Sequence, residues 1–222
     1  MRSLAQPKVL ARALFAGLVT SLACYPRLDS WTARGAPVSI LWVILLWSMF
    51  VLWGFVFAWH FQYSNRPVFV PDKFEPKLWE QVSLGAIALA VLMHFLIDPQ
   101  NRLITPETYP TSFDSWTRMS LFAIALQPLF FCFAPFAFFI RLLRKQDTAI
   151  ALTVVFGLFV LTIKLGESSV PAPFWTLVEL VCLQVLAVFA GLYLYLKGGA
   201  FMVWWAFLIL QLRFLLDFVG KG

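Results

Sequence analysis

Few side chains in the apolar stretches of this 222-residue sequence could do acid–base or metal chemistry. Imidazole and carboxylate groups are the side chains that most often move protons or bind metals at active sites. The candidates within the apolar stretches are His60, His94, Glu179, Arg213 and Asp217, together with the polar residues Gln127 and Gln184. None of them belongs to a recognisable hydrolase, metalloprotease or phosphate-binding motif.

The two histidines lie in consecutive apolar segments, which raises the question of whether they share a haem iron or a zinc ion. If these segments cross a membrane in opposite directions, His60 ends one crossing and His94 lies near the far end of the next. Two such positions are separated by about 20 Å along the membrane normal. We therefore expect no shared metal site, and the sequence predicts no cofactor.

Glu179 is the single residue that most strongly suggests a function, because a carboxylate about one turn inside an apolar segment is costly to bury. It could instead form an ion pair or a hydrogen bond within the protein, with Arg213 or Lys164 as its partner. Arg213 and Asp217 are four residues apart, a spacing at which opposite charges on one helix pair with each other. If the chain is an enzyme, the catalytic candidates are Glu179, His94 and His60.

The composition places these residues in an integral membrane protein. The sequence is 61% hydrophobic and only 13% charged, and its mean hydropathy is +0.83, whereas a soluble domain is about 25% charged. We predict an all-α fold, a polytopic transmembrane bundle of about seven helices that forms one domain over residues 1–222. The predicted apolar segments are 9–24, 37–61, 79–97, 117–140, 148–165, 174–196 and 200–219.

The basic residues favour one orientation in the membrane. Lys and Arg concentrate on the cytoplasmic side if the N-terminus is cytoplasmic, most clearly in the sequence RLLRK at 141–145. The first apolar segment is expected to be an uncleaved helix rather than a cleaved signal peptide. The net charge of +6 fits loops and lipid headgroups, so the predicted partner is a lipid bilayer and not nucleic acid. We expect that membrane to be the bacterial inner membrane.

The second half of the sequence resembles the CAAX-protease and bacteriocin-processing family of intramembrane proteases (CPBP, or Abi). The similarity lies in PLFFCFAPFAFFIRLLRKQDTAIALTVVFGLFV at 128–160 and in VFAGLYLYLKGGAFMVWWAFLILQLRFLLDF at 188–218. The resemblance implies N-terminal spans over 9–110 and a protease-like core over 111–222. Members of this family are held to use a glutamate, assisted by histidines, to activate water and cut a peptide bond in or near the membrane.

Aligned on Phe156 and Gly157, the positions of the family's catalytic motifs carry no such groups in this sequence. The Glu-Glu pair of the family falls on Gln127 and Pro128. The family's remaining motif positions fall on Cys132, Val160, Leu208 and Leu212. The resemblance therefore implies a non-catalytic member. We interpret Gln127-Pro128 as a helix irregularity at a former active site.

Three functions remain open from the sequence. The first is a non-catalytic scaffold or accessory subunit of a membrane complex, with another membrane protein as partner. The second is a divergent intramembrane endopeptidase that uses Glu179 with His60 or His94. The third is a small transporter or channel, for which Gln127, Gln184 and Glu179 could line a polar path.

Overall fold

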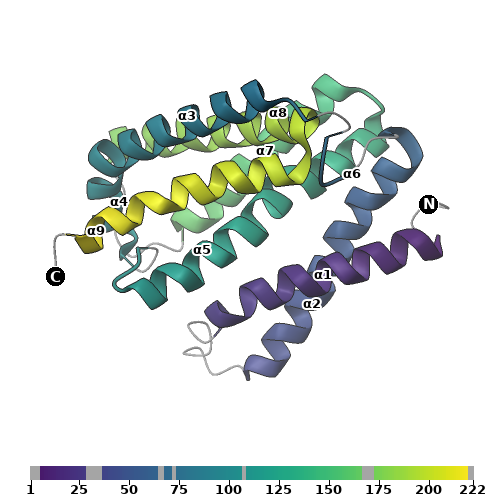
Figure 1. Ribbon diagram of the computed structural model, residues 1–222, viewed down its shortest axis with the longest axis horizontal. Coiled ribbons are helices and arrows are strands. Elements are labelled where there is room, and N and C mark those ends of the chain that lie inside the picture. The colour runs from purple at the N-terminus through teal and green to yellow at the C-terminus, as the bar shows by residue number, and fades with distance from the viewer. Residues whose placement is uncertain are drawn as a thin grey trace.

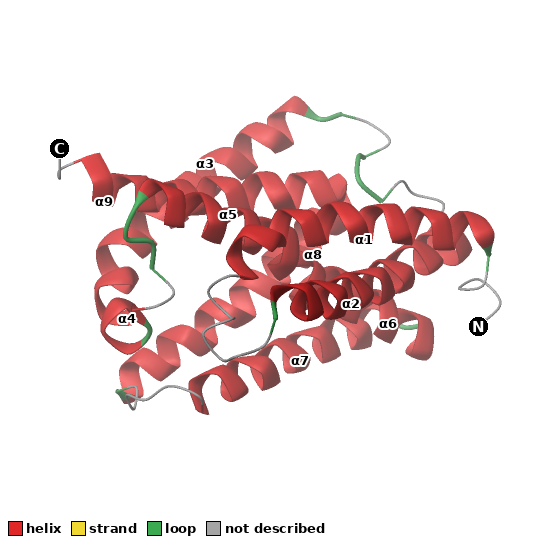
Figure 2. Cartoon of the chain, turned by 90° about the horizontal axis from the view of Figure 1, so that it is seen from below, coloured by secondary structure: helices red, strands yellow, loops and turns green. Residues whose placement is uncertain are grey.

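The computed structural model describes residues 6–28, 37–64, 68–71, 74–106, 109–166 and 173–219. These ranges form helices joined by short connections and contain no strand (Figures 1 and 2). Within them, six continuous helical stretches are long and apolar enough to cross a membrane, which confirms the predicted all-α membrane bundle. The six stretches are Pro7–Leu28, Val38–Gln62, Pro76–Ile104, Phe113–Leu143, Gln146–Gly166 and Phe174–Phe218.

Several of these stretches are built from more than one helical segment. The first is α1 (Pro7–Leu28), and the second joins α2 (Val38–Trp59) to η2 (His60–Ser64). The third joins α3 (Pro76–Leu92), η3 (Met93–Ile97) and α4 (Asp98–Ile104). The fourth joins α5 (Phe113–Pro128), η5 (Leu129–Phe133) and α6 (Ala134–Leu143). The others are α7 (Gln146–Gly166) and α8 (Phe174–Leu212), and α8 continues into η6 (Arg213–Leu215) and α9 (Leu216–Val219).

The sixth stretch is too long for a single crossing, and it folds back on itself. A straight helix over the 39 residues of α8 would span about 58 Å, nearly twice the thickness of the hydrocarbon core. Near the start of α8, Thr176 bonds to Gln100 of α4, and just after its end Arg213 bonds to Asp98 of the same short helix. Both ends of α8 therefore lie at one end of the bundle, and the yellow part of the chain in Figure 1 is its returning half. The two halves on either side of Gly199 correspond to the predicted segments 174–196 and 200–219, and the six described stretches are close to the about seven crossings predicted.

The reversal takes place at Gly199, whose backbone has φ 73° and ψ −175°. Only glycine adopts this conformation readily, because a Cβ atom would clash with the backbone. The segment before α3 holds the chain just after the turn. The amide of Ala200 donates to the carbonyl of Val68 at 3.0 Å, and the amide of Phe201 donates to that of Phe69 at 3.1 Å. These bonds satisfy amides at the start of the returning helix, which have no acceptor within that helix.

Three of the described stretches contain a π turn, and the one that follows Gln127 and Pro128 is the helix irregularity predicted there. In η5 the amide of Ala134 donates to the carbonyl of Leu129, five residues back, in place of the four-residue spacing of an α-helix. Proline has no amide hydrogen to continue the hydrogen bonds of α5, so the pattern shifts at this point. The other two π turns, η2 and η3, contain the two histidines.

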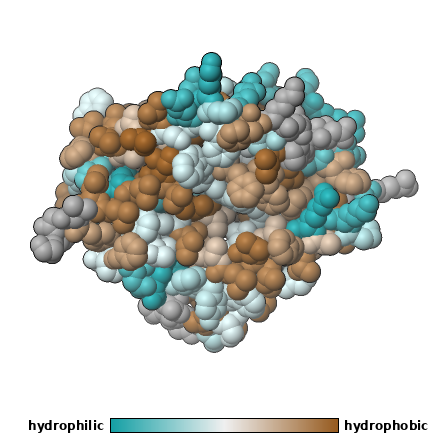
Figure 3. All heavy atoms as spheres, viewed as in Figure 1, coloured by the Kyte–Doolittle hydropathy of each residue, from teal (hydrophilic) through white to brown (hydrophobic). Residues whose placement is uncertain are grey.

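Large apolar side chains lie both inside the bundle and on its outer faces. Inside, the indole Nε1 of Trp53 donates to the Oγ1 of Thr20 at 2.9 Å and ties α2 to α1. Outside, large side chains such as Phe15 on α1 and Phe159 on α7 are 71% and 61% exposed, and apolar residues cover much of the face in Figure 3. A surface of this kind suits lipid rather than water. The chain is an integral membrane protein.

Candidate functional site

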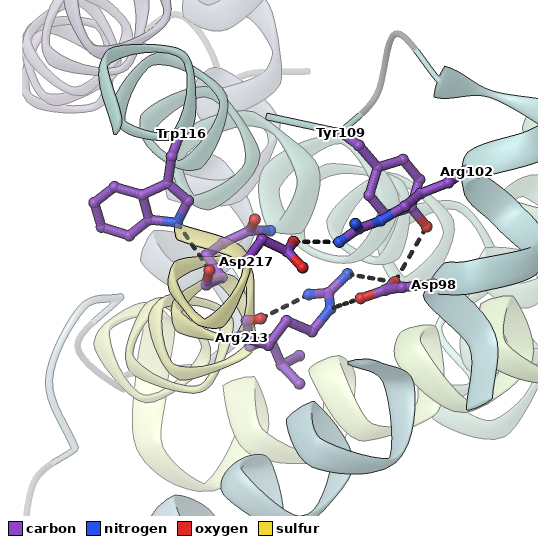
Figure 4. Close-up of polar contacts among 8 residues, drawn as sticks. Asp98, Arg102, Tyr109, Trp116, Arg213 and Asp217 are labelled. Atoms are coloured by element: carbon purple, nitrogen blue, oxygen red, sulfur yellow. Dashed lines mark hydrogen bonds and ion pairs between the residues drawn. The ribbon is translucent and has the colours of Figure 1, made fainter. Parts of the chain in front are cut away.

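Charged side chains meet at the end of the bundle where α4 and α9 lie (Figure 4). Arg213 donates from Nε to the Oδ2 of Asp98 at 2.9 Å and from Nη2 to its Oδ1 at 3.4 Å. The Asp98 side chain is 2% exposed and the Arg213 side chain 9%, so this ion pair is buried. We refer to Asp98, Arg102, Tyr109, Arg213 and Asp217 together as the ion-pair cluster.

The second ion pair of the cluster joins Arg102 of α4 to Asp217 of α9. The pairing of Arg213 with Asp217, which their spacing predicted, is therefore wrong. Asp98 and Arg102 are four residues apart on α4, and Arg213 and Asp217 have the same spacing near the end of the chain. Because the two segments lie side by side, each arginine binds the carboxylate of the other segment instead of the one on its own.

Tyr109, in the connection between α4 and α5, completes the cluster. Its hydroxyl donates to the Oδ1 of Asp98 at 3.1 Å, and the guanidinium carbon of Arg102 lies 5.0 Å from the centre of its ring. Burial raises the pKa of Tyr109, and the charge of Asp98 and the hydrogen bond to it raise the pKa further. The positive charges of Arg213 and Arg102 act in the opposite direction with smaller effect. The phenol is thus held in its neutral, hydrogen-donating form.

This raised pKa predicts that Tyr109 makes the protein less stable in alkali. A tyrosine whose folded-state pKa lies above its ordinary value of 10.0 contributes stability that is complete below about pH 10 and is lost as the pH rises further. We expect Tyr109→Phe to lower the free energy of unfolding by about 1–2 kcal/mol at about pH 8, through loss of one hydrogen bond to a charged acceptor. We also expect the decline above about pH 10 to be shallower in this variant than in the wild type.

Denaturant unfolding in detergent micelles, followed by tryptophan fluorescence over this pH range, measures both effects. Tyr25→Phe is the matched control, because Tyr25 is 47% exposed and lies on α1, which contributes no residue to the cluster. The same alkaline profile in Tyr109→Phe and in the wild type would contradict the prediction.

Further polar contacts fasten the same end of the bundle. Arg213 donates from Nη1 to the carbonyl of Leu210 at 2.6 Å, and the Nε1 of Trp116 in α5 donates to the carbonyl of Gln211 at 2.9 Å. These carbonyls belong to the last turn of α8, directly before the chain continues into η6. Both carboxylates of the ion-pair cluster are bonded to arginines. The cluster therefore ties α4 to the end of the chain, and Trp116 adds α5.

The two histidines lie at opposite ends of the bundle, as the sequence predicts. The Nε2 of His60 lies 2.6 Å from the hydroxyl of Tyr195, close to the turn at Gly199. His94 lies in η3, four residues before Asp98 of the ion-pair cluster. Its Nδ1 is buried and has no hydrogen-bond partner among the described residues. Across the described ranges, no group of three or more His, Cys, Asp or Glu residues could hold a metal ion.

Glu179 lies in the first half of α8, near the end that holds the ion-pair cluster. Its Oε2 is buried and has no hydrogen-bond partner within the described part of the chain. Arg213, one of its two predicted partners, is bonded to Asp98 instead. Glu179 and Tyr195 are sixteen residues apart along α8, which corresponds to about 24 Å. The structure therefore does not bring Glu179 to His60.

The positions aligned with the family's motifs are brought together only in part. Cys132 of η5 packs against α8, and a Cβ added at Gly191 would lie 2.8 Å from its sulfur. Gly157 of α7 packs in a similar way, since a Cβ there would lie 3.0 Å from the Nε2 of Gln184 on α8. The segments η5, α7 and the first half of α8 are therefore neighbours. The remaining positions are spread over α5, α7 and the returning half of α8, and they are Gln127, Pro128, Val160, Leu208 and Leu212.

Sequence reasoning missed three members of the ion-pair cluster, namely Asp98, Arg102 and Tyr109. The segment DPQNRL at 98–103 has a loop-like composition, with proline and asparagine beside charges, yet it forms most of α4. The signal that could have identified it is a mirrored spacing. An acid precedes a base by four residues at 98 and 102, and a base precedes an acid by four at 213 and 217. When two such segments lie side by side, each base can pair with the acid of the other segment, as Arg213 does with Asp98 and Arg102 with Asp217.

Comparison with known proteins adds no relative to this picture. No protein-family model, no curated protein and no solved structure matches the chain. Function must therefore be inferred from the chain's own residues and their contacts.

Proposed function

We propose that this chain is a non-catalytic integral membrane protein that serves as a scaffold or accessory subunit of a membrane-protein complex. The observation that carries the proposal is the ion-pair cluster, in which the charges bind one another and the Asp98–Arg213 pair is buried. Asp98 and Asp217 are each bonded to an arginine, so these carboxylates hold helices together rather than act on a substrate. A bundle fastened in this way, with an apolar outer surface, is suited to packing against lipid and partner helices.

Residues 111–222 form, in this proposal, a degenerate core of the CPBP type. Two kinds of observation support it, the sequence similarity and the replacements at the family's catalytic positions. Gln127 and Pro128 stand where the family has its glutamate pair, and the π turn η5 follows directly after them. Water activation at neutral pH needs a general base or a metal ion. An amide and a proline ring supply neither.

The proposed location is the bacterial inner membrane, with a cytoplasmic N-terminus. Described Lys and Arg residues are more numerous at the bundle end that holds Gly199 than at the end that holds the ion-pair cluster. The first end carries Lys8, Arg12, Lys77, Arg141, Arg144, Lys145 and Lys197. The second end carries Arg27, Arg102, Arg118, Lys164 and Arg213. Three of the latter, Arg102, Arg118 and Arg213, are bonded to carboxylates at the same end.

Cysteine labelling tests this orientation. On a background without the native cysteines, Thr111→Cys is expected to react with a membrane-impermeant maleimide from the periplasmic side. Lys145→Cys is expected to react only after the inner membrane has been opened, because its turn lies at the opposite end of the bundle. Both residues are exposed, so equal labelling in detergent is the control. The reverse pattern would invert the proposed topology.

Purification from native membranes tests the proposed function itself. The tagged chain, extracted in mild detergent, is expected to carry a second membrane protein in a constant molar ratio through size-exclusion chromatography. An unrelated polytopic protein with the same tag and abundance is the control and should not carry that protein. A chain that purifies alone from every native membrane preparation contradicts an accessory role.

A divergent intramembrane endopeptidase is the second candidate, and one observation favours it. The Oε2 of Glu179 and the Nδ1 of His94 are both buried without a hydrogen-bond partner among the described residues, and buried polar atoms generally have one. Gln100 of α4 contacts Thr176 of α8, and the α3–α4 stretch and the first half of α8 run in opposite directions. Along the bundle axis, Glu179 and His94 are therefore about one helical turn apart. If the purified chain hydrolyses peptides and Glu179→Gln abolishes this activity, the protein is an endopeptidase and the non-catalytic proposal is wrong.

A further inference from the structure

A connection of two residues joins α6 to α7, and both residues are cations. Because α6 ends at Leu143 and α7 begins at Gln146, Arg144 and Lys145 alone separate two membrane crossings. The 21 residues of α7 give it a length of about 31 Å, just enough to cross a hydrocarbon core of about 30 Å. A connection this short cannot extend far into water, so its charges lie at the level of the lipid headgroups.

The positive charge of this connection is not neutralised within the protein. Arg144 and Lys145 are both exposed, and neither makes an ion pair with any residue that the structure describes. Arg141 adds a third cation about one turn earlier, and the one carboxylate between positions 141 and 147 belongs to Asp147. The connection therefore presents an excess of positive charge to its surroundings.

The residues directly before the connection face lipid acyl chains. Leu142 is 67% exposed and Leu143 is 36% exposed, and acyl chains are as apolar as leucine. Arginine and lysine next to such residues extend their charged ends towards the membrane surface. Apolar contacts and unpaired cations thus lie side by side, which matches the acyl chain and the phosphate of one phospholipid.

From these observations we infer that the α6–α7 connection binds anionic phospholipids, with Arg144 and Lys145 against the headgroup phosphate. In phosphatidylcholine the positive choline group offsets the phosphate, whereas phosphatidylglycerol keeps a net negative charge that attracts these cations. At the other end of the bundle, Arg102, Arg118 and Arg213 are already bonded to carboxylates. The preference for anionic lipid therefore belongs to the α6–α7 connection, and it holds whether or not the chain is an accessory subunit.

Quenching by nitroxide-labelled lipids tests this inference on the full-length chain in phosphatidylcholine vesicles. On a background without the native cysteines, Leu142→Cys carries a fluorophore beside the connection. Leu103→Cys, at a position that is 77% exposed, carries the same fluorophore at the opposite end. Beside position 142, we expect labelled phosphatidylglycerol to bind about five- to twentyfold more tightly than labelled phosphatidylcholine, since each cation near the headgroups contributes about fivefold. No comparable preference is expected beside position 103.

Two double variants separate the connection from the net charge of the protein. Arg144→Gln with Lys145→Gln is expected to abolish the preference beside position 142. Arg118→Gln with Lys164→Gln removes the same formal charge at the opposite end and is expected to keep the preference.

A single variant separates lipid binding from the end of α6. Arg144 has φ 56° and ψ 19°, a left-handed conformation that glycine adopts more readily than arginine. Arg144→Gly is therefore expected to lower the preference for phosphatidylglycerol about fivefold, while the unfolding midpoint stays the same or rises.

Salt and a soluble phosphate ester show which source of phosphate is bound. Raising NaCl from about 0.02 M to about 0.5 M is expected to weaken the preference, because exposed charges are screened. Glycerol phosphate is added at an ionic strength matched with NaCl, and it is expected to displace no more labelled phosphatidylglycerol than NaCl does.

Four outcomes would overturn the inference. Equal binding of the two lipids beside position 142 would show that the cations select no lipid. An equal loss of preference in both double variants would show a response to net charge alone. A lower unfolding midpoint in Arg144→Gly would show that the arginine stabilises the end of α6. Stronger displacement by glycerol phosphate than by NaCl would assign the connection to a soluble phosphate.

Discussion

Arg213→Met is expected to lower the free energy of unfolding by about 3–5 kcal/mol, because it leaves the carboxylate of Asp98 buried without its positive partner. The Asp98 side chain is 2% exposed, and the hydroxyl of Tyr109 would be its one remaining donor in the described cluster. The substitution also removes the hydrogen bond to the carbonyl of Leu210 at the end of α8. Denaturant unfolding in mixed micelles measures the loss.

Two further variants show whether the loss comes from an uncompensated charge. Adding Asp98→Leu to Arg213→Met removes both charges and is expected to recover much of the stability, since a buried ion pair contributes little net energy over an apolar pair. Arg118→Met is the matched surface control. Its pair with Asp114 is well exposed, at 44% and 72%, and is worth about 0.5 kcal/mol or less. A double variant no more stable than Arg213→Met alone would show that the cluster does not act as a charge pair.

Gly199→Ala is expected to destabilise the protein by about 2–6 kcal/mol, from backbone strain and overpacking together. The backbone angles at this position, φ 73° and ψ −175°, are almost closed to residues with a side chain. In addition, a Cβ there would lie 2.6 Å from the carbonyl oxygen of Phe69. That oxygen accepts the hydrogen bond from Phe201 at the start of the returning helix, so it cannot move away without breaking this bond.

Thermal unfolding in detergent measures the effect, with Gly166→Ala as the matched control. A Cβ added at Gly166 meets no atom within 4 Å, so this control is expected to change stability by no more than about 1 kcal/mol. Equal midpoints for the two alanine variants would show that the reversal does not depend on the backbone at Gly199.

Together these two positions fix the last membrane crossing at both of its ends. Gly199 sets the turn from which the returning half of α8 starts, and Arg213 binds that half to α4 where it ends. The returning half also carries Leu208 and Leu212, two of the positions aligned with the motifs of the CPBP family. Loss of either attachment is therefore expected to affect the whole protease-like half in the proposed reading.

The sequence by itself determined the fold class and most of the membrane crossings. Apolar segments of about 20 residues must satisfy their backbone hydrogen bonds internally when they cross a bilayer, and helices do this without help from other segments. The same local rule located the irregularity at Pro128, because a missing amide hydrogen is a property of one residue. The separation of His60 from His94 followed from segment order alone.

Only the tertiary structure decided which side chains meet. Asp217 was the nearest carboxylate to Arg213 in the sequence, but Asp98, 115 residues away, binds it instead. The composition of DPQNRL suggested a loop, but the segment forms a helix beside the end of the chain. In this helix Asp98 and Arg102 are placed to bind Arg213 and Asp217.

An apolar groove lined by Trp47 of α2 and Leu126 of α5 likewise exists only where the two helices pack together. Contacts between distant segments depend on how the helices pack against one another. The spacing of residues within one segment does not determine that packing.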